Sequence, residues 1–188
     1  MTICVMYMPG FGSECRHRGR TSGTGLRSAV MRLSCAMAAI WALGQQAWAQ
    51  DDARITVETT LDDFHLAASE GDGKRYFSLF SDDAVFHGTD ITERWTKAEF
   101  QEYALPHFGD GHGWTYIPQT RNTYISEDGN TAWFDETLLN DNFGLTRGTG
   151  VLVLTDSGWK IAQYHLTLPV PNNLIRNLVT MIEEQEQE

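Results

Sequence analysis

The second half of the sequence alternates apolar and polar residues with a period of two, and this alternation limits the fold more than any other feature. Four stretches carry it: residues 114–125, 131–140, 143–155 and 159–167. Turn-forming residues separate them at Glu127–Asn130, Asn140–Asn142 and Asp156–Gly158. A period of two is typical of β-strands with one buried face, and short turns of this kind join antiparallel neighbours. The sequence therefore predicts an antiparallel meander of four strands.

Helical spacing precedes the meander. Apolar residues recur every three or four positions within residues 54–70, and Gly71 and Gly73 follow them. This spacing predicts a helix that ends at the glycines. Asp72 is a good cap for a short second helix that reaches Phe80.

A strand and a third helix are expected between these helices and the meander. Residues 84–87 form a short apolar run that predicts a strand. Thr96 and Glu99 make a capping box at the start of a helix that we expect Pro106 to end. Helices followed by a meander predict the α+β class.

Residues 1–49 have the features of a leader. Arg27 and Arg32 precede a short apolar run, and Ala47-Trp48-Ala49 follows it. This order is typical of a secretory signal peptide, with Met31 as its expected start and cleavage near Ala49. The apolar run is too short to span a bilayer. We therefore expect a periplasmic or secreted protein of three parts: a leader (1–49), one domain (50–171), and a C-terminal helix with an acidic tail (172–188).

The composition excludes several classes of function. All three cysteines lie in the leader, so the remainder can form neither a disulfide nor a thiol nucleophile. The leader also holds five of the 14 basic residues and one of the 25 acidic residues, which leaves a net charge of −15 on residues 50–188. Such a charge repels nucleic acid and anionic membranes, so we expect neither as a partner.

Three segments carry a resemblance to a known family: Phe80–Asp90, Trp95–Phe100 and Gly158–His165. Together they resemble the SnoaL-like branch of the nuclear transport factor 2-like superfamily, over about residues 54–170. The resemblance implies a cone-shaped, cystatin-like fold, in which a curved antiparallel sheet wraps around N-terminal helices and leaves a pocket at its open end. That superfamily holds isomerases, dehydratases, epoxide hydrolases, ligand binders and association domains, so the fold does not name a reaction.

The last predicted strand offers candidate pocket residues. Strict alternation places Gln163 and His165 on the same face as Trp159 and Ile161. Because the two apolar residues favour the interior, we expect Gln163 and His165 to face the pocket. His165 is then either a neutral imidazole bonded to a neighbour in the wall or a group that contacts ligand and exchanges protons.

On the strand over residues 131–140, only one of two adjacent acids can face inward. We favour Asp135 beside Trp133, because a buried carboxylate has a raised pKa and can serve as a general base. A register shift of one residue would give this role to Glu136. The structural alternative is that Asp135 pairs with Arg121 or Arg147 across the sheet.

The remaining candidates lie near the expected mouth of the cone. His87 and Asp90 flank Gly88 and either bond each other, hold a ligand, or only stabilise the turn. Trp95 is expected as a lid or core aromatic that contacts the ligand, and Trp133 is a further expected ligand contact. By resemblance to related enzymes, in which a tyrosine assists an Asp or His, Tyr116 or Tyr124 joins the set.

A metal or cofactor is not expected. His107, Asp110 and His112 are close in sequence but lie in a glycine-rich loop, without the cysteine ligands or helical histidine pair of common zinc sites.

These observations favour an exported homodimer that binds a small, partly apolar molecule in its cone. A second hypothesis is a cofactor-free lyase, isomerase or hydrolase that uses Asp135 with His165 or His87. A third is an association domain that joins subunits through its outer sheet face. The sequence leaves open whether the protein is an enzyme.

Overall fold

The computed structural model describes residues 50–109 and 113–185. The predicted leader lies outside the described residues. The first described element is a helix over residues 50–69, called the N-terminal helix below. Its apolar stripe is buried as the spacing predicts: Val57, Leu61, Phe64 and Ala68 are at most 3% exposed. A short helix, α2 (Gly73–Ser78), follows, and the Asp72 carboxylate caps it by accepting a hydrogen bond of 3.0 Å from the Arg75 backbone N–H.

Helix α3 (Lys97–Phe108) begins at the predicted capping box but extends past its predicted end. The Thr96 backbone N–H donates to Glu99 Oε2 at 2.8 Å, and the Glu99 N–H donates to Thr96 Oγ1 at 3.4 Å. Pro106 lies within the helix, so the expectation that it ends the helix is wrong. A proline costs the helix one backbone hydrogen bond, whereas one more turn buries Phe108 against Trp114, with ring centroids 4.8 Å apart.

The sheet contains six strands in the order β2-β1-β6-β5-β4-β3. Their bounds are β1 (Phe80–His87), β2 (Arg94–Thr96), β3 (Ile117–Ile125), β4 (Thr131–Asn140), β5 (Gly144–Thr155) and β6 (Gly158–Thr167). The predicted meander of β3 to β6 is confirmed, with antiparallel pairing throughout. Two features were not predicted: the three-residue strand β2, and the parallel pairing of β1 with β6.

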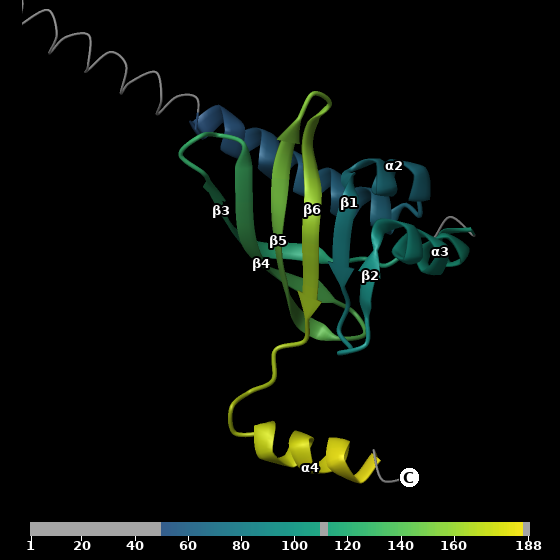
Figure 1. Cartoon of the computed structure of the whole chain (residues 1–188). Helices are drawn as coiled ribbons and strands as arrows, with labels where there is room; N and C mark the ends of the chain where they lie inside the picture. Colours follow the sequence, from purple (N-terminus) through teal and green to yellow (C-terminus); the bar gives the residue numbers. More distant parts are fainter. Residues whose placement is uncertain (1–49, 110–112, 186–188) are drawn as a thin grey trace, which may run out of the picture. The chain divides into compact units, whose positions relative to one another are not determined.

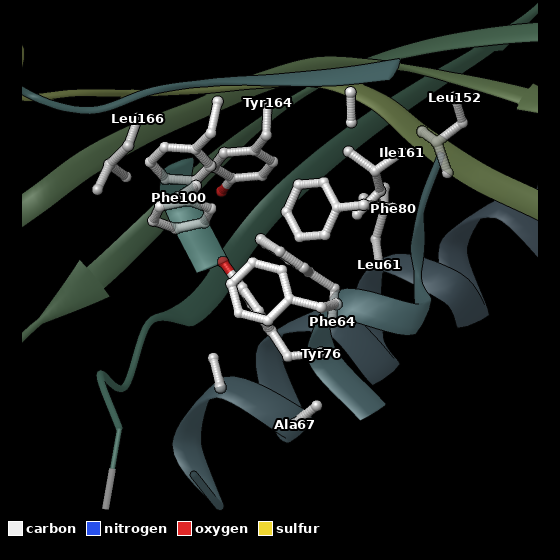
Figure 2. Packing of buried hydrophobic residues seen from close by; sticks show 14 of the residues in the cluster. Leu61, Phe64, Ala67, Tyr76, Phe80, Phe100, Leu152, Ile161, Tyr164 and Leu166 are labelled. Atoms are coloured by element: carbon white, nitrogen blue, oxygen red, sulfur yellow. The ribbon is translucent and has the colours of Figure 1, made fainter. Parts of the chain in front are cut away.

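The sheet is curved and does not close, and the N-terminal helix crosses it (Figure 1). Side chains of that helix meet the inner face of the sheet, as in the contact of Phe64 with Tyr164 at 4.8 Å between ring centroids. Figure 2 shows Leu61, Phe64 and Tyr76 beneath the β6 residues Ile161 and Tyr164. The predicted α+β cone is therefore confirmed.

A bulge in β6 decides which of its residues face the core. Val151 of β5 pairs with Gln163, but the next residue, Leu152, pairs with Ile161, so Ala162 has no partner of its own. An extra residue of this kind reverses the alternation beyond it. Trp159 and Ile161 are buried before the bulge, and Tyr164 and Leu166 are buried after it. Gln163 and His165 therefore lie on the outer face, and the prediction that they face inward is wrong.

The C-terminal helix, α4 (Ile175–Gln185), is amphipathic but buries none of its residues. Its exposed apolar side chains include Leu178, Val179 and Ile182. Among the described residues, no helix combines the length and the apolar character needed to cross a bilayer.

Candidate functional site

The candidate site is a cavity of about 240 Å³ on the inner side of the sheet. The N-terminal helix, α2, α3 and strands β1, β2 and β6 contribute to its walls, together with residues of connecting segments. Ten of its sixteen lining residues are aromatic. The polar groups of the lining are few: His65, Thr89, Glu93, the hydroxyls of its tyrosines and the indole N–H groups of Trp95 and Trp114.

Stacked rings build much of one wall. Tyr103 stacks on Trp95 at 4.9 Å between centroids, and Trp95 stacks on Phe100 at 5.6 Å. Phe86 continues the series, at 3.9 Å from Phe100 and 5.6 Å from Tyr164, with every one of these four pairs within 20° of parallel. Offset stacking of this kind adds to the stability that area burial gives, so this wall is well packed before any ligand binds.

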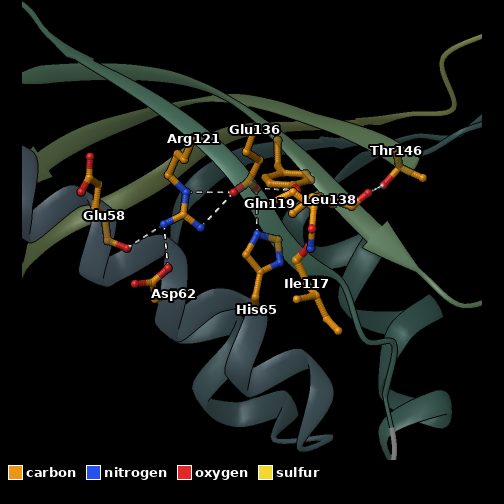
Figure 3. Close-up of polar contacts among 10 residues, drawn as sticks. Glu58, Asp62, His65, Ile117, Gln119, Arg121, Glu136, Leu138 and Thr146 are labelled. Atoms are coloured by element: carbon orange, nitrogen blue, oxygen red, sulfur yellow. Dashed lines mark hydrogen bonds and ion pairs between the residues drawn. The ribbon is translucent and has the colours of Figure 1, made fainter. Parts of the chain in front are cut away.

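A buried carboxylate, Glu136 of β4, contacts two of the lining side chains, His65 and Tyr164, and Figure 3 shows it with His65 and Arg121. It is 1% exposed and accepts hydrogen bonds from three side chains. Arg121 Nε donates to Oε2 at 2.9 Å, Tyr164 Oη donates to Oε1 at 3.1 Å, and His65 Nε2 lies 2.7 Å from Oε1. Gly148 opposite leaves room for this cluster, because a side-chain carbon there would collide with the Tyr164 hydroxyl.

The environment keeps Glu136 ionised. Burial alone would raise the pKa of Glu136, but hydrogen bonds and charge interactions with His65 and Arg121 outweigh burial and lower the pKa. Arg121 is held in turn by Asp62, whose Oδ1 accepts from Nη1 at 2.7 Å, and by the Glu58 carbonyl oxygen at 3.2 Å. An arginine braced in this way is a fixed counter-charge for the carboxylate.

The ionised carboxylate fixes the tautomer of His65. A carboxylate can only accept hydrogen bonds, so the proton of the shared bond lies on His65 Nε2. In the neutral imidazole, Nδ1 then carries a lone pair, and no hydrogen bond joins Nδ1 to another described residue. His65 lines the cavity, and its Nδ1 has the lone pair of a hydrogen-bond acceptor.

Tyr76 lines the same cavity and carries a buried hydroxyl. Its side chain is fully buried, and its hydroxyl makes no hydrogen bond with the described residues. Burial raises the pKa of the Tyr76 hydroxyl well above its usual value. The nearby Trp114 side chain opposes this rise, although the two side chains do not meet the distance and angle of a hydrogen bond. Buried hydroxyls are nearly always paired, so the Tyr76 hydroxyl is an exception within the described part of the chain.

The structure brings only part of the sequence-predicted set to the cavity. Trp95 and Tyr116 line it. That Trp95 and Tyr116 contact a ligand remains a prediction. Trp133 does not line it: this residue is 47% exposed on the outer face and stacks on Tyr124 at 5.7 Å. Gln163 is also exposed on the outer face, because the bulge at Ala162 reverses the alternation of β6.

Of the two adjacent acids, the alternative Glu136 faces inward and Asp135 does not. Asp135 lies on the outer face, where its Oδ2 accepts from Asn122 Nδ2 at 2.9 Å. The favoured orientation of Asp135 is therefore wrong, because the buried face of β4 holds Phe134, Glu136 and Leu138. The expected cross-strand partner Arg121 does bind an acid, but that acid is Glu136.

The predicted histidines and Asp90 lie away from the cavity. His87 and His165 are neighbours on the paired strands β1 and β6, with ring centroids 5.4 Å apart. Desolvation, with repulsion from His165 and Arg94, lowers the pKa of His87. Asp90 stabilises the turn, because its Oδ1 accepts from the Thr92 N–H at 2.8 Å and from Thr92 Oγ1 at 2.6 Å. Asp135 and these histidines therefore do not converge.

Four residues of the site were missed: His65, Tyr76, Glu93 and Arg121. His65 had a readable signal, because it follows Leu61 by four positions and precedes Ala68 by three, on the predicted buried stripe. Within residues 50–109 and 113–185, no three His, Cys, Asp or Glu residues cluster as metal ligands. Two of the three residues of the considered metal loop, Asp110 and His112, lie outside the described residues.

Comparison with known proteins agrees with this architecture. A family model for the SnoaL-like domain matches residues 57–171. Among curated proteins, none matches the sequence at significant similarity. Solved structures with a similar fold include a nuclear transport factor 2-like protein of unknown function from Pseudomonas putida, with 12% identity and a TM-score of 0.54 over 65% of this chain and 90% of that chain.

Two further similar structures have descriptions that name a reaction. One is a candidate dehydratase of the nuclear transport factor 2-like family from Streptomyces avermitilis, with 17% identity, a TM-score of 0.54, and coverage of 64% of this chain and 99% of that chain. The other is a candidate scytalone dehydratase from Novosphingobium aromaticivorans, with 13% identity, a TM-score of 0.53, and coverage of 64% and 89%. At these identities the likeness concerns the fold alone.

Proposed function

The chain belongs to the SnoaL-like domain family, and we propose that it binds a small, largely apolar molecule in the cavity inside its cone. The observation that carries this proposal is the aromatic cavity of about 240 Å³. An apolar cavity of about 150 Å³ is enough to bind benzene. The volume here is therefore sufficient for a molecule of one ring with substituents, or of two small rings.

The polar groups narrow the ligand further. The Tyr76 hydroxyl is an unpaired donor, and His65 Nδ1 is an unpaired acceptor among the described residues. A few polar groups in an apolar pocket orient the ligand. A ring with a carbonyl or hydroxyl group would satisfy both side chains.

The binding test combines identification with a blocked cavity. Mass spectrometry of whatever co-purifies, followed by a thermal-shift screen of small phenols and ketones, should give ligands that raise the melting temperature. Ala68→Phe fills the cavity, because Ala68 lines it, and should abolish the shift. Ala98→Phe changes an exposed residue of α3 and is the matched control. Equal shifts in both variants would place binding elsewhere and refute the proposal.

A second candidate function is a cofactor-free proton transfer on the bound molecule. The observation that favours it is the His65 imidazole held at 2.7 Å from an ionised, buried Glu136. His65 Nδ1 would take a proton from a carbon or oxygen of the ligand, and the nearby carboxylate would stabilise the imidazolium that forms. The Tyr76 hydroxyl would donate to the oxyanion that develops. Elimination of water and isomerisation both fit these steps.

Hydrogen exchange tests this candidate without knowledge of the product. In D₂O, NMR should show the protein accelerating exchange at the carbon next to the carbonyl of a bound ketone. His65→Gln should remove the acceleration while ligand binding remains. His87→Gln changes a histidine outside the cavity lining and should leave the rate unchanged. An unaltered rate in His65→Gln would leave binding as the function and remove the catalytic one.

Export and dimerisation belong to the same proposal. We propose that the protein acts outside the cytoplasm after cleavage near Ala49, because of the sequence features of residues 1–49. N-terminal sequencing of protein from a periplasmic fraction tests cleavage, and light scattering tests the homodimer. An uncleaved cytoplasmic protein, or a monomer at micromolar concentration, would contradict the respective part.

A further inference from the structure

One charged residue of the cavity has no role in the function proposed so far. Glu93 lies in the segment between β1 and β2, where its carbonyl oxygen accepts from the Gly88 N–H at 2.9 Å. Its Oε2 accepts from the Asp90 N–H at 3.2 Å. Glycine at position 88 leaves room for the Glu93 carboxylate, which a side-chain carbon there would force to move. The turn therefore positions this carboxylate in the cavity wall.

The charge of Glu93 is not balanced by a neighbour. No ion pair joins Glu93 to another described residue, and no Lys or Arg is among the described lining residues. Arg94, the next residue in the chain, forms no ion pair with Glu93, and Arg121 is occupied by Glu136 and Asp62. The field of Glu93 reaches the adjacent wall, since burial and, after it, Glu93 raise the pKa of Tyr116. The cavity is thus anionic at this point, as is the protein as a whole.

Aromatic rings surround the same region. Trp95, Tyr103, Trp114 and Tyr116 line the cavity together with Glu93. The faces of such rings attract cations, Trp most strongly, and a site of this kind recognises alkylammonium groups. A carboxylate next to aromatic rings repels an anionic ligand and gains from a cationic one.

We propose that the cavity selects organic cations, namely molecules with a ring or alkyl body and an ammonium group, and that Glu93 receives the ammonium group. This inference rests on the proposed binding function and names the class of ligand. The apolar body would lie against the inner aromatic rings. The charged end would lie beside Glu93 and the Tyr116 ring, because Trp95 is already stacked on Tyr103 and Phe100. Carboxylates and phosphates of the same size would be excluded.

A matched series of three compounds tests the inference: 2-phenylethylamine, 2-phenylethanol and 3-phenylpropionate. They share one skeleton and differ in charge. Titration calorimetry should show the amine binding at least about tenfold more tightly than the alcohol, a factor equivalent to about 1.4 kcal/mol, and no binding of the carboxylate. In Glu93→Gln, the amine should lose this advantage while the alcohol binds as before. Glu102→Gln changes an exposed acid of α3 and should change none of the three affinities.

The outcomes separate this inference from the function on which it rests. If the alcohol binds as tightly as the amine, or if Glu93→Gln retains the preference, the inference is wrong while ligand binding in the cone stands. If none of the three binds to the wild-type protein, both are refuted for ligands of this size. Circular dichroism of Glu93→Gln shows whether the variant is folded, and the unchanged affinity for the alcohol is the second control.

Discussion

Replacement of Arg121 by methionine is expected to be among the most destabilising changes in the polar cluster around Glu136. Glu136 is 1% exposed, and the Arg121 side chain is 11% exposed, so both charges lie away from solvent. Methionine keeps much of the volume of arginine but removes the charge and all its hydrogen bonds. Glu136 would then be a buried carboxylate held only by His65 and Tyr164.

The magnitude follows from the burial of the pair. Removal of one partner of a buried ion pair costs about 3–5 kcal/mol, because it leaves an uncompensated charge. In a chain of this size each kcal/mol lowers the melting temperature by about 2–4 °C, so the expected fall is roughly 6–20 °C. Arg147→Met is the matched control on the exposed outer face of the sheet, and a surface change of this kind alters stability by less than about 0.5 kcal/mol.

The pH dependence of the loss is a stricter test. The pKa of Glu136 is lowered in the folded protein, so its contribution to stability is present above the unfolded pKa, about 4.3. It is lost as the pH falls through the lower, folded pKa. The difference between the wild-type protein and Arg121→Met should therefore be largest at neutral pH and should narrow as the pH falls from the pKa of Glu136 in the variant towards its lower pKa in the wild type.

Urea denaturation at pH 7, 5 and 3.5, followed by tryptophan fluorescence, measures both effects. If Arg121→Met lowers the free energy of unfolding by less than about 1 kcal/mol at pH 7, the Arg121–Glu136 pair contributes no more than a surface ion pair does. A loss that stays constant down to pH 3.5 would show that packing, not charge, is responsible. Either result would refute the account of Glu136 as a buried carboxylate that depends on Arg121.

Three further changes test other parts of the structure. Tyr76→Phe removes an unpaired buried hydroxyl, so the free protein should be as stable as the wild type or up to about 1 kcal/mol more stable. A ligand that stabilises the wild type should give a smaller thermal shift with this variant. A large loss of stability would show that the hydroxyl is paired. Deletion of Ala162 removes the extra residue and gives a regular strand in which Ile161, Tyr164 and Leu166 still face inward, so the domain should keep a cooperative unfolding transition in calorimetry; loss of that transition would contradict the assigned register. Gly88→Ala forces the Glu93 carboxylate to move. Calorimetry should show weaker binding of 2-phenylethylamine and unchanged binding of 2-phenylethanol. An equal loss for both compounds would indicate a general disturbance of the cavity.

Periodicity predicted the elements well and the orientation of polar residues poorly. The buried stripe of the N-terminal helix and the bounds of β4 follow from local spacing, which one segment of chain determines by itself. The inner face of β6 does not, because the bulge at Ala162 depends on pairing with both β5 and β1. Gln163 and His165 were assigned to the wrong face for this reason.

The sequence could not decide between Asp135 and Glu136 for a different reason. Both faces of β4 carry an aromatic residue and an acid, so alternation alone allowed either register. The deciding partners are Arg121, opposite in β3, and His65, 71 positions earlier in the N-terminal helix. A contact between segments so far apart leaves no local pattern in one sequence.

The parallel pairing of β1 with β6 also bears on how the domain can be made. β1 ends at His87, and its partner strand begins only at Gly158, so the intervening hairpins must be synthesised before the two strands can join. Such contacts between distant segments slow folding, because a long loop must close first. Phe86 and Tyr164, on these two strands, both line the cavity. A nascent chain therefore has no binding site until its final strand leaves the ribosome, and a version truncated before residue 158 should be unable to hold ligand even if its helices form.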